Sequence, residues 1–107
     1  MRVSSPLTPS LASALEAVLD GLPADALRRA TASLIEAYRS GTPPTAQVLH
    51  DTTTAAAYAA YRMPATHAAV TRAVRHTTDL VPGLRVGSVV DIGGGTGAAT
   101  WAVAQAF

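Results

Sequence analysis

Apolar residues recur at helical spacing along the first part of the chain and predict two helices there. In the first helix, which Ser10 can cap, the apolar positions are separated by four, three and four residues: Leu11, Leu15, Val18 and Leu22. In the second, which starts at the turn around Pro23, one side carries Leu27, Leu34 and Tyr38. Gly41 and the pair Pro43 and Pro44 end this helix. The pattern predicts a helical hairpin whose arginines face solvent.

Two further helices are predicted between Asp51 and Leu80. Asp51 can cap a helix that runs from Ala55 to Arg62, and Pro64 breaks or kinks it because its ring clashes with the preceding turn. The next helix runs from about Ala65 to Leu80 and is expected to bury Ala69, Val70, Ala73 and Val74. Its exposed side carries Arg72, Arg75 and Asp79.

After residue 83, the helical spacing of apolar residues gives way to a strand-like pattern. The β-branched apolar run over residues 86–92 is typical of a strand buried on both faces of a parallel sheet. Gly93 to Gly97 then predict a turn, and residues 97–106 a helix. We therefore expect an incomplete α/β protein, with a helical region over residues 1–81 and the start of a second domain over 82–107. The alternative is a small helical protein in which the glycine segment is only a loop.

Composition narrows the classes of protein to consider. The chain has 107 residues, a net charge of +1, 49% hydrophobic and 14% charged residues, which fits one small folded domain and not a disordered chain. The absence of cysteine excludes disulfides and thiolate metal ligands. No signal-peptide pattern and no run of ~18 apolar residues is found, so a cytoplasmic protein is expected. All 8 basic residues are arginine and alanine is abundant, which indicates GC-rich coding and a bacterial source.

The glycine turn carries the candidate chemistry. Glycines between a strand and a helix allow a ligand to approach the backbone closely, and the N–H groups of the helix favour a negatively charged group. A P-loop is excluded, because it needs a lysine and the chain has none. Gly93, Gly95 and Ala98 match the G-x-G-x-x-G/A dinucleotide fingerprint, so an NAD-dependent oxidoreductase stays open. Thr96 can bind the ligand through its N–H or its hydroxyl.

The same turn also resembles the first motif of class I S-adenosylmethionine-dependent methyltransferases, D-x-G-x-G-x-G. Asp91, Gly93, Gly95 and Gly97 match that motif at every position. The resemblance implies a Rossmann-like methyltransferase fold that holds S-adenosylmethionine at the turn. In such a site, Arg62 is the candidate to face the carboxylate of the cofactor.

The segment over residues 57–70 resembles the Rsm22 family of methyltransferase-like proteins of the small ribosomal subunit. Family members show a Tyr-x-x-x-Arg-Met-Pro-Ala-Thr segment, matched here from Tyr58 to Thr66, and Trp101 matches a tryptophan that follows the turn. The turn reads Gly-Gly-Gly-Thr-Gly where the family more often has Gly-Ala-Gly-Pro-Gly, and His67 stands where a tyrosine is common. The resemblance implies a methyltransferase that acts on or with the small ribosomal subunit or its RNA.

The chain by itself is expected to be inactive and to bind the cofactor weakly or not at all. Relatives tend to carry a downstream cysteine cluster suited to an iron–sulfur centre, and a chain without cysteine cannot hold one. The full-length protein would be the enzyme. A non-catalytic helical module for ribosome assembly is the alternative function.

Other candidate sites are weaker. His50, His67 and His76 are 17 and 9 residues apart, which is not a helical ligand spacing, so we expect no metal site and interpret them as surface or hydrogen-bonded core histidines. Three arginines could contact RNA phosphates, namely Arg72, Arg75 and Arg85. A net charge of +1 gives them little electrostatic support.

Overall fold

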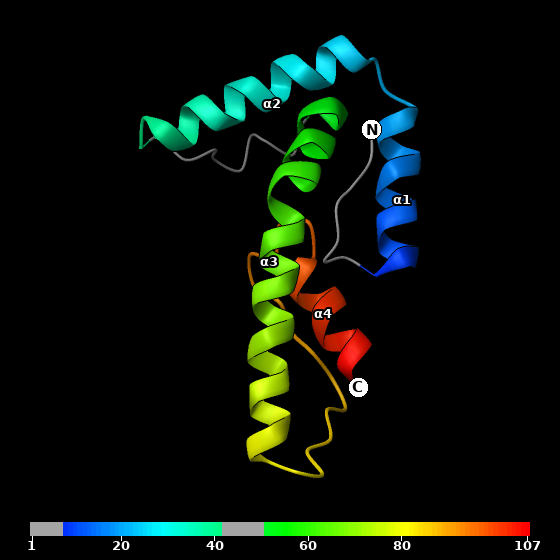
Figure 1. Cartoon of the computed structure of the whole chain (residues 1–107), viewed down its shortest axis with the longest axis vertical. Coiled ribbons are helices and arrows are strands. Elements are labelled where there is room, and N and C mark those ends of the chain that lie inside the picture. Colours follow the sequence, from blue (N-terminus) through cyan, green and yellow to red (C-terminus); the bar gives the residue numbers. More distant parts are fainter. Residues whose placement is uncertain (1–7, 42–50) are drawn as a thin grey trace.

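The computed structural model describes residues 8–41 and 51–107, which form four helices (Figure 1). They are α1 (Pro9–Asp20), α2 (Ala24–Arg39), α3 (Thr52–Leu80) and α4 (Ala98–Ala106). The long helix α3 is central: α2 crosses its N-terminal end, α1 lies beside that end, and α4 packs against its middle (Figure 1). No strand occurs in these two stretches, so the predicted α/β, Rossmann-like class is wrong for the part of the chain that the structure describes.

Helix α1 buries a different stripe from the predicted one. Leu11, Leu15 and Leu19 are buried, whereas Val18 is 50% exposed. Residues four apart lie on one helical face, so the three leucines form one continuous stripe toward α3. The cap also differs, because Thr8 and not Ser10 precedes the helix, and Pro9 occupies its first turn.

Helix α2 begins directly after Pro23 and buries Leu27 and Leu34, as the pattern predicts. Asp25 lies in its first turn and Arg39 in its last, which complements the helix dipole. The predicted hairpin with α1 is wrong. Both helices pack mainly against α3 and not against each other.

Helix α3 passes through Pro64 without ending, so the predicted pair of helices is one helix. A proline inside a helix removes one hydrogen bond and costs about 3 kcal/mol through its clash with the preceding turn. Packing on both sides of Pro64 compensates, since α1 and α2 contact the first half of α3 and α4 contacts its middle. The predicted cap is confirmed: the Asp51 carboxylate accepts the Thr54 N–H at 3.0 Å and the Thr54 hydroxyl at 2.8 Å.

The second half of α3 turns a different face inward from the predicted one. Ala69 and Ala73 are exposed, and Val70 and Val74 are only half-buried. The buried positions are Met63 and His67, which face α4. The small, evenly spread alanines along this helix leave its buried side poorly defined by hydrophobicity alone.

Residues 86–92 are exposed and form no strand. Val90 is 84% exposed and Ile92 is 93% exposed. A strand is stabilised by hydrogen bonds to a neighbouring strand, and the described residues offer none to this segment. The β-branched residues therefore favour a strand, but no segment among the described residues pairs with them to form a sheet.

Helix α4 confirms the helix predicted over residues 97–106, and Gly93 to Gly97 form turns before it. Ala98 and Ala102 are 3% and 2% exposed, because their small side chains let α4 approach α3 closely. Ala98 belongs to one hydrophobic core, in which the buried leucines of α1 and α2 surround Ala56, Ala57 and Met63 of α3. Within the described ranges, no helix has the length and apolar character needed to cross a membrane.

Candidate functional site

A cavity of about 250 Å³ lies between α3 and the glycine turn. Five of the six site residues expected from the sequence line it: Arg62 from α3, and Asp91, Gly93, Gly95 and Thr96 from the turn. The sixth, Gly97, is the N-cap residue of α4 and immediately precedes the cavity-lining Ala98. Segments separated by about thirty positions in the sequence are thus brought to one site.

The backbone of the turn requires glycine at three positions. Gly93, Gly95 and Gly97 have φ angles of 68°, 57° and 79°, a region that side-chain-bearing residues rarely adopt. The Gly97 N–H donates to the Gly94 carbonyl at 2.9 Å and closes the turn. A Cβ atom at Gly93 or Gly95 would meet no atom within 4 Å, so open space adjoins the backbone there.

The Asp91 carboxylate organises the turn. It accepts a hydrogen bond from the Thr100 hydroxyl at 2.9 Å, which links the start of the turn to the first helical turn of α4. It also lies against Gly94, where an added Cβ would come within 2.6 Å of its Oδ2 atom. Gly94 therefore leaves room for Asp91, although its own φ is not in the left-handed region.

The N-terminus of α4 borders the cavity through Ala98 and Ala99. Its N-cap, Gly97, provides no side-chain hydrogen bond to the first helical N–H groups. These N–H groups have no partner within the helix and lie at the positive end of its dipole. The cavity therefore has a backbone surface that favours a negatively charged group.

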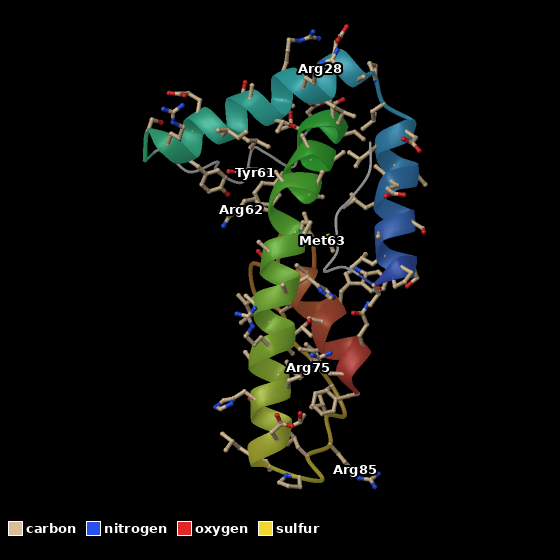
Figure 2. All side chains as sticks on the ribbon, viewed as in Figure 1. Arg28, Tyr61, Arg62, Met63, Arg75 and Arg85 are labelled. Carbon is tan, nitrogen blue, oxygen red and sulfur yellow. The ribbon has the colours of Figure 1, made fainter. Side chains whose placement is uncertain are left out.

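Arg62 is held by two tyrosines. Its guanidinium carbon lies 4.9 Å from the centre of the Tyr38 ring and 5.9 Å from that of Tyr61, and the centres of the two rings are 6.1 Å apart. Figure 2 shows Arg62 and Tyr61 on the N-terminal half of α3. Such cation–π contacts restrain the side chain without neutralising its charge. No carboxylate among the described residues forms an ion pair with Arg62. A positive charge at the cavity thus remains available to a ligand.

Tyr38 also connects to the cavity through Tyr58. Desolvation and a hydrogen bond with Tyr58 raise the pKa of Tyr38 above its ordinary value, while the positive charge of Arg62 partly lowers it. The Tyr38 hydroxyl therefore stays protonated at neutral pH and can donate or accept hydrogen bonds. Tyr58 lines the cavity beside Arg62.

Sequence reasoning missed three of these participants: Tyr38, Tyr58 and Thr100. Tyr58, Arg62 and Thr66 are spaced four apart and line the cavity together, a signal that the sequence already contains. Thr66 also donates its hydroxyl hydrogen bond to the Arg62 carbonyl at 3.1 Å. Tyr38 belongs to α2, so no local pattern could have assigned it to this site.

The histidines are placed apart from one another. His50 lies outside the described residues. His67 is buried and pairs through Nε2 with Gln105 of α4 at 2.8 Å, whereas His76 is exposed. The described part of the chain contains no group of three residues suited to hold a metal ion.

A family model described as "Mitochondrial small ribosomal subunit Rsm22" matches residues 52–107. The chain belongs to this family. The match begins at the first residue of α3 and contains the complete glycine turn and α4, so the Rsm22 region holds every cavity-lining residue. No curated protein and no solved structure matches the chain. The Rsm22 description names a mitochondrial ribosomal subunit; the bacterial source and the cytoplasmic location stay predictions.

Proposed function

We propose that this Rsm22-family chain works with the small ribosomal subunit and that the cavity at its glycine turn binds the amino-acid end of S-adenosylmethionine. The family description supports the ribosomal part of the proposal. The observation that carries the cofactor part is the meeting of Arg62 with the glycine turn in one cavity. Bound S-adenosylmethionine would supply an electrophilic methyl group for transfer to RNA or a ribosomal protein.

The charges at the cavity suit that ligand. The amino-acid end of S-adenosylmethionine carries a carboxylate and an ammonium group beside the sulfonium. Arg62 and the N-terminus of α4 provide positive charge for the carboxylate, and Asp91 provides negative charge for the cationic groups. Open space beside the backbone of Gly93 and Gly95 leaves room for the ligand to approach.

The size of the cavity limits the affinity. At about 250 Å³ it is smaller than the ~300–1,000 Å³ usual for drug-sized ligands, so it covers the amino-acid end and leaves the nucleoside end in solvent. We therefore expect weak binding by this chain, as the sequence already predicted. Arg62 would orient the carboxylate, and the glycine turn would set the distance of the ligand from α4.

An NMR titration of the 107-residue chain with S-adenosylmethionine tests the proposal, because it detects weak binding. Resonances of Gly93, Gly95 and Thr96 should shift, and Arg62→Gln should weaken binding at least tenfold, about 1.4 kcal/mol. Arg29→Gln makes the same charge change at an exposed position of α2 and should have no effect. NAD serves as the competing ligand; turn resonances that respond to NAD and not to S-adenosylmethionine would contradict the assignment.

A second function is favoured by the exposed apolar segment after α3. Val86, Val89, Val90 and Ile92 are between 36% and 93% exposed, more apolar surface than a short loop usually presents. Such a segment suits a non-catalytic assembly protein that is covered in its complex. This function becomes the better account if neither S-adenosylmethionine nor NAD perturbs the turn.

A further inference from the structure

A second cavity, of about 420 Å³, lies between the C-terminal half of α3 and the C-terminal half of α4. Its polar side chains are Thr8, His67, Thr71, Arg75, Thr78 and Gln105. It shares no lining residue with the cavity at the glycine turn. Figure 2 shows Arg75 on the length of α3 that lies beside α4.

Three of these side chains form a polar stripe along α3. His67, Thr71 and Arg75 are spaced four apart, so they follow one another on the same helical face. His67 is only 2% exposed, and its Nδ1 atom has no hydrogen-bond partner. The buried Oγ1 atom of Thr71 has none either. Buried polar atoms are paired in the great majority of cases, so these two unpaired atoms in one cavity are candidates to bind a ligand.

The hydrogen bonds around His67 determine which of its atoms remains free. The Gln105 amide nitrogen donates to the Thr8 hydroxyl at 2.9 Å, which directs its carbonyl oxygen toward Nε2 of His67 at 2.8 Å. Nε2 must then carry a hydrogen, since a carbonyl oxygen only accepts. Nδ1 is left as an acceptor in the neutral ring and as a donor in the imidazolium.

We propose that this cavity binds a phosphate group, which is held by the Arg75 guanidinium and the Thr71 hydroxyl beside the unpaired Nδ1 atom of His67. A tetrahedral oxyanion offers oxygens to donors from several directions, which suits donors placed along one stripe. Arg75 is exposed at the cavity and has no ion pair with any described carboxylate. The phosphate can come from a free nucleotide or from the backbone of RNA.

Calorimetric and NMR titrations of the full chain with inorganic phosphate test the site. Resonances of His67, Thr71 and Arg75 should shift, and Arg75→Gln should weaken binding at least tenfold. Arg72→Gln is the matched control, because Arg72 is exposed next to the stripe and does not line the cavity. Equal losses in the two variants, or no phosphate binding by the parent, would overturn the proposal.

Thr71→Val separates a binding role from a structural one. The substitution keeps the shape and removes a buried hydroxyl that has no partner, so it should leave the thermal midpoint unchanged or higher while phosphate affinity falls. A lower thermal midpoint with unchanged phosphate affinity would contradict the binding role of Thr71.

The source of the phosphate is distinguished by two probes. Adenosine monophosphate should compete with inorganic phosphate if the site accepts a free nucleotide. A short single-stranded oligoribonucleotide should compete, and lose affinity in Arg75→Gln but not in Arg72→Gln, if the site accepts the RNA backbone. Failure of both probes to displace bound phosphate would contradict a site for phosphate esters.

Discussion

The Thr100 hydroxyl donates a hydrogen bond to the Asp91 carboxylate at 2.9 Å, across the whole glycine turn. This bond joins Asp91, two positions before the first glycine of the turn, to the first turn of α4. It explains why an acidic residue at position 91 benefits the fold even before any ligand binds. The turn is thereby held in the shape that places its glycines opposite Arg62.

Thr100→Val should remove that bond while it retains the shape of the side chain. We expect the free energy of unfolding to fall by about 1 kcal/mol, the usual net contribution of a hydrogen bond. Urea denaturation measures the change, and Thr100→Ser, which keeps a hydroxyl, is the control. If Thr100→Val is equally destabilising in an Asp91→Ala background, which has no acceptor at this position, the bond is not the cause.

Gly95→Ala should destabilise the turn, because alanine at a φ of 57° costs about 1–2 kcal/mol. Space does not limit this position, since an added Cβ would meet no atom within 4 Å. Gly87→Ala is the matched control: its Cβ is equally unobstructed and its backbone is not left-handed, so it should be neutral or slightly stabilising. Thermal unfolding of the two variants gives the comparison, and similar midpoints would contradict the assigned backbone strain.

Leu19→Ala should be among the most destabilising substitutions in α1. Leu19 is 1% exposed in the core, and truncating a buried leucine costs about 2–5 kcal/mol. The adjacent Val18 is 50% exposed, so Val18→Ala should change stability by less than about 0.5 kcal/mol. Chemical denaturation distinguishes this stripe from the one that the sequence predicted, for which Val18 would be the sensitive position.

Asp51→Ala should lower stability in a pH-dependent manner. Hydrogen bonds from the Thr54 hydroxyl and N–H lower the pKa of Asp51 below its ordinary value of 3.8. A carboxylate with a depressed pKa stabilises the fold above its ordinary pKa, and this contribution is lost as the pH falls through the folded value. The parent should therefore melt higher than Asp51→Ala at neutral pH, and the difference should vanish in acid. Asp79→Ala, near the other end of α3, removes a charge without removing a cap and should lack this acid-sensitive difference.

Pro64 and the segment over residues 86–92 show where local rules did not decide the fold. The sequence predicted a helix break at Pro64, but packing of α1, α2 and α4 on both sides keeps α3 continuous. It predicted a strand at residues 86–92, yet Ile92 is 93% exposed and the described residues contain no strand with which this segment could pair. At Pro64, tertiary contacts outweigh the helix-breaking preference of proline. At residues 86–92, the preference for a strand is not enough without a neighbouring strand.

The candidate site was partly accessible to sequence reasoning. Arg62 and the glycines were expected to belong together, and they line one cavity. Tyr38, which holds Arg62 from α2, and Gln105, which pairs with His67 from α4, were not expected. These partners lie on other helices, and their distance along the chain leaves no periodic signal.

The sequence by itself determined the local features: the Asp51 cap, the glycines at positive φ, the limits of α4 and membership of the Rsm22 family. Each depends on the conformational preferences or the identity of residues that are close together in the chain. Only the tertiary structure decided that α3 continues through Pro64, that Leu19 and not Val18 is buried, and that Tyr38 of α2 contacts Arg62. Burial, strand pairing and cavities all need surfaces from segments that are distant in the sequence. The free energy they contribute is gained only when those segments pack together in the fold.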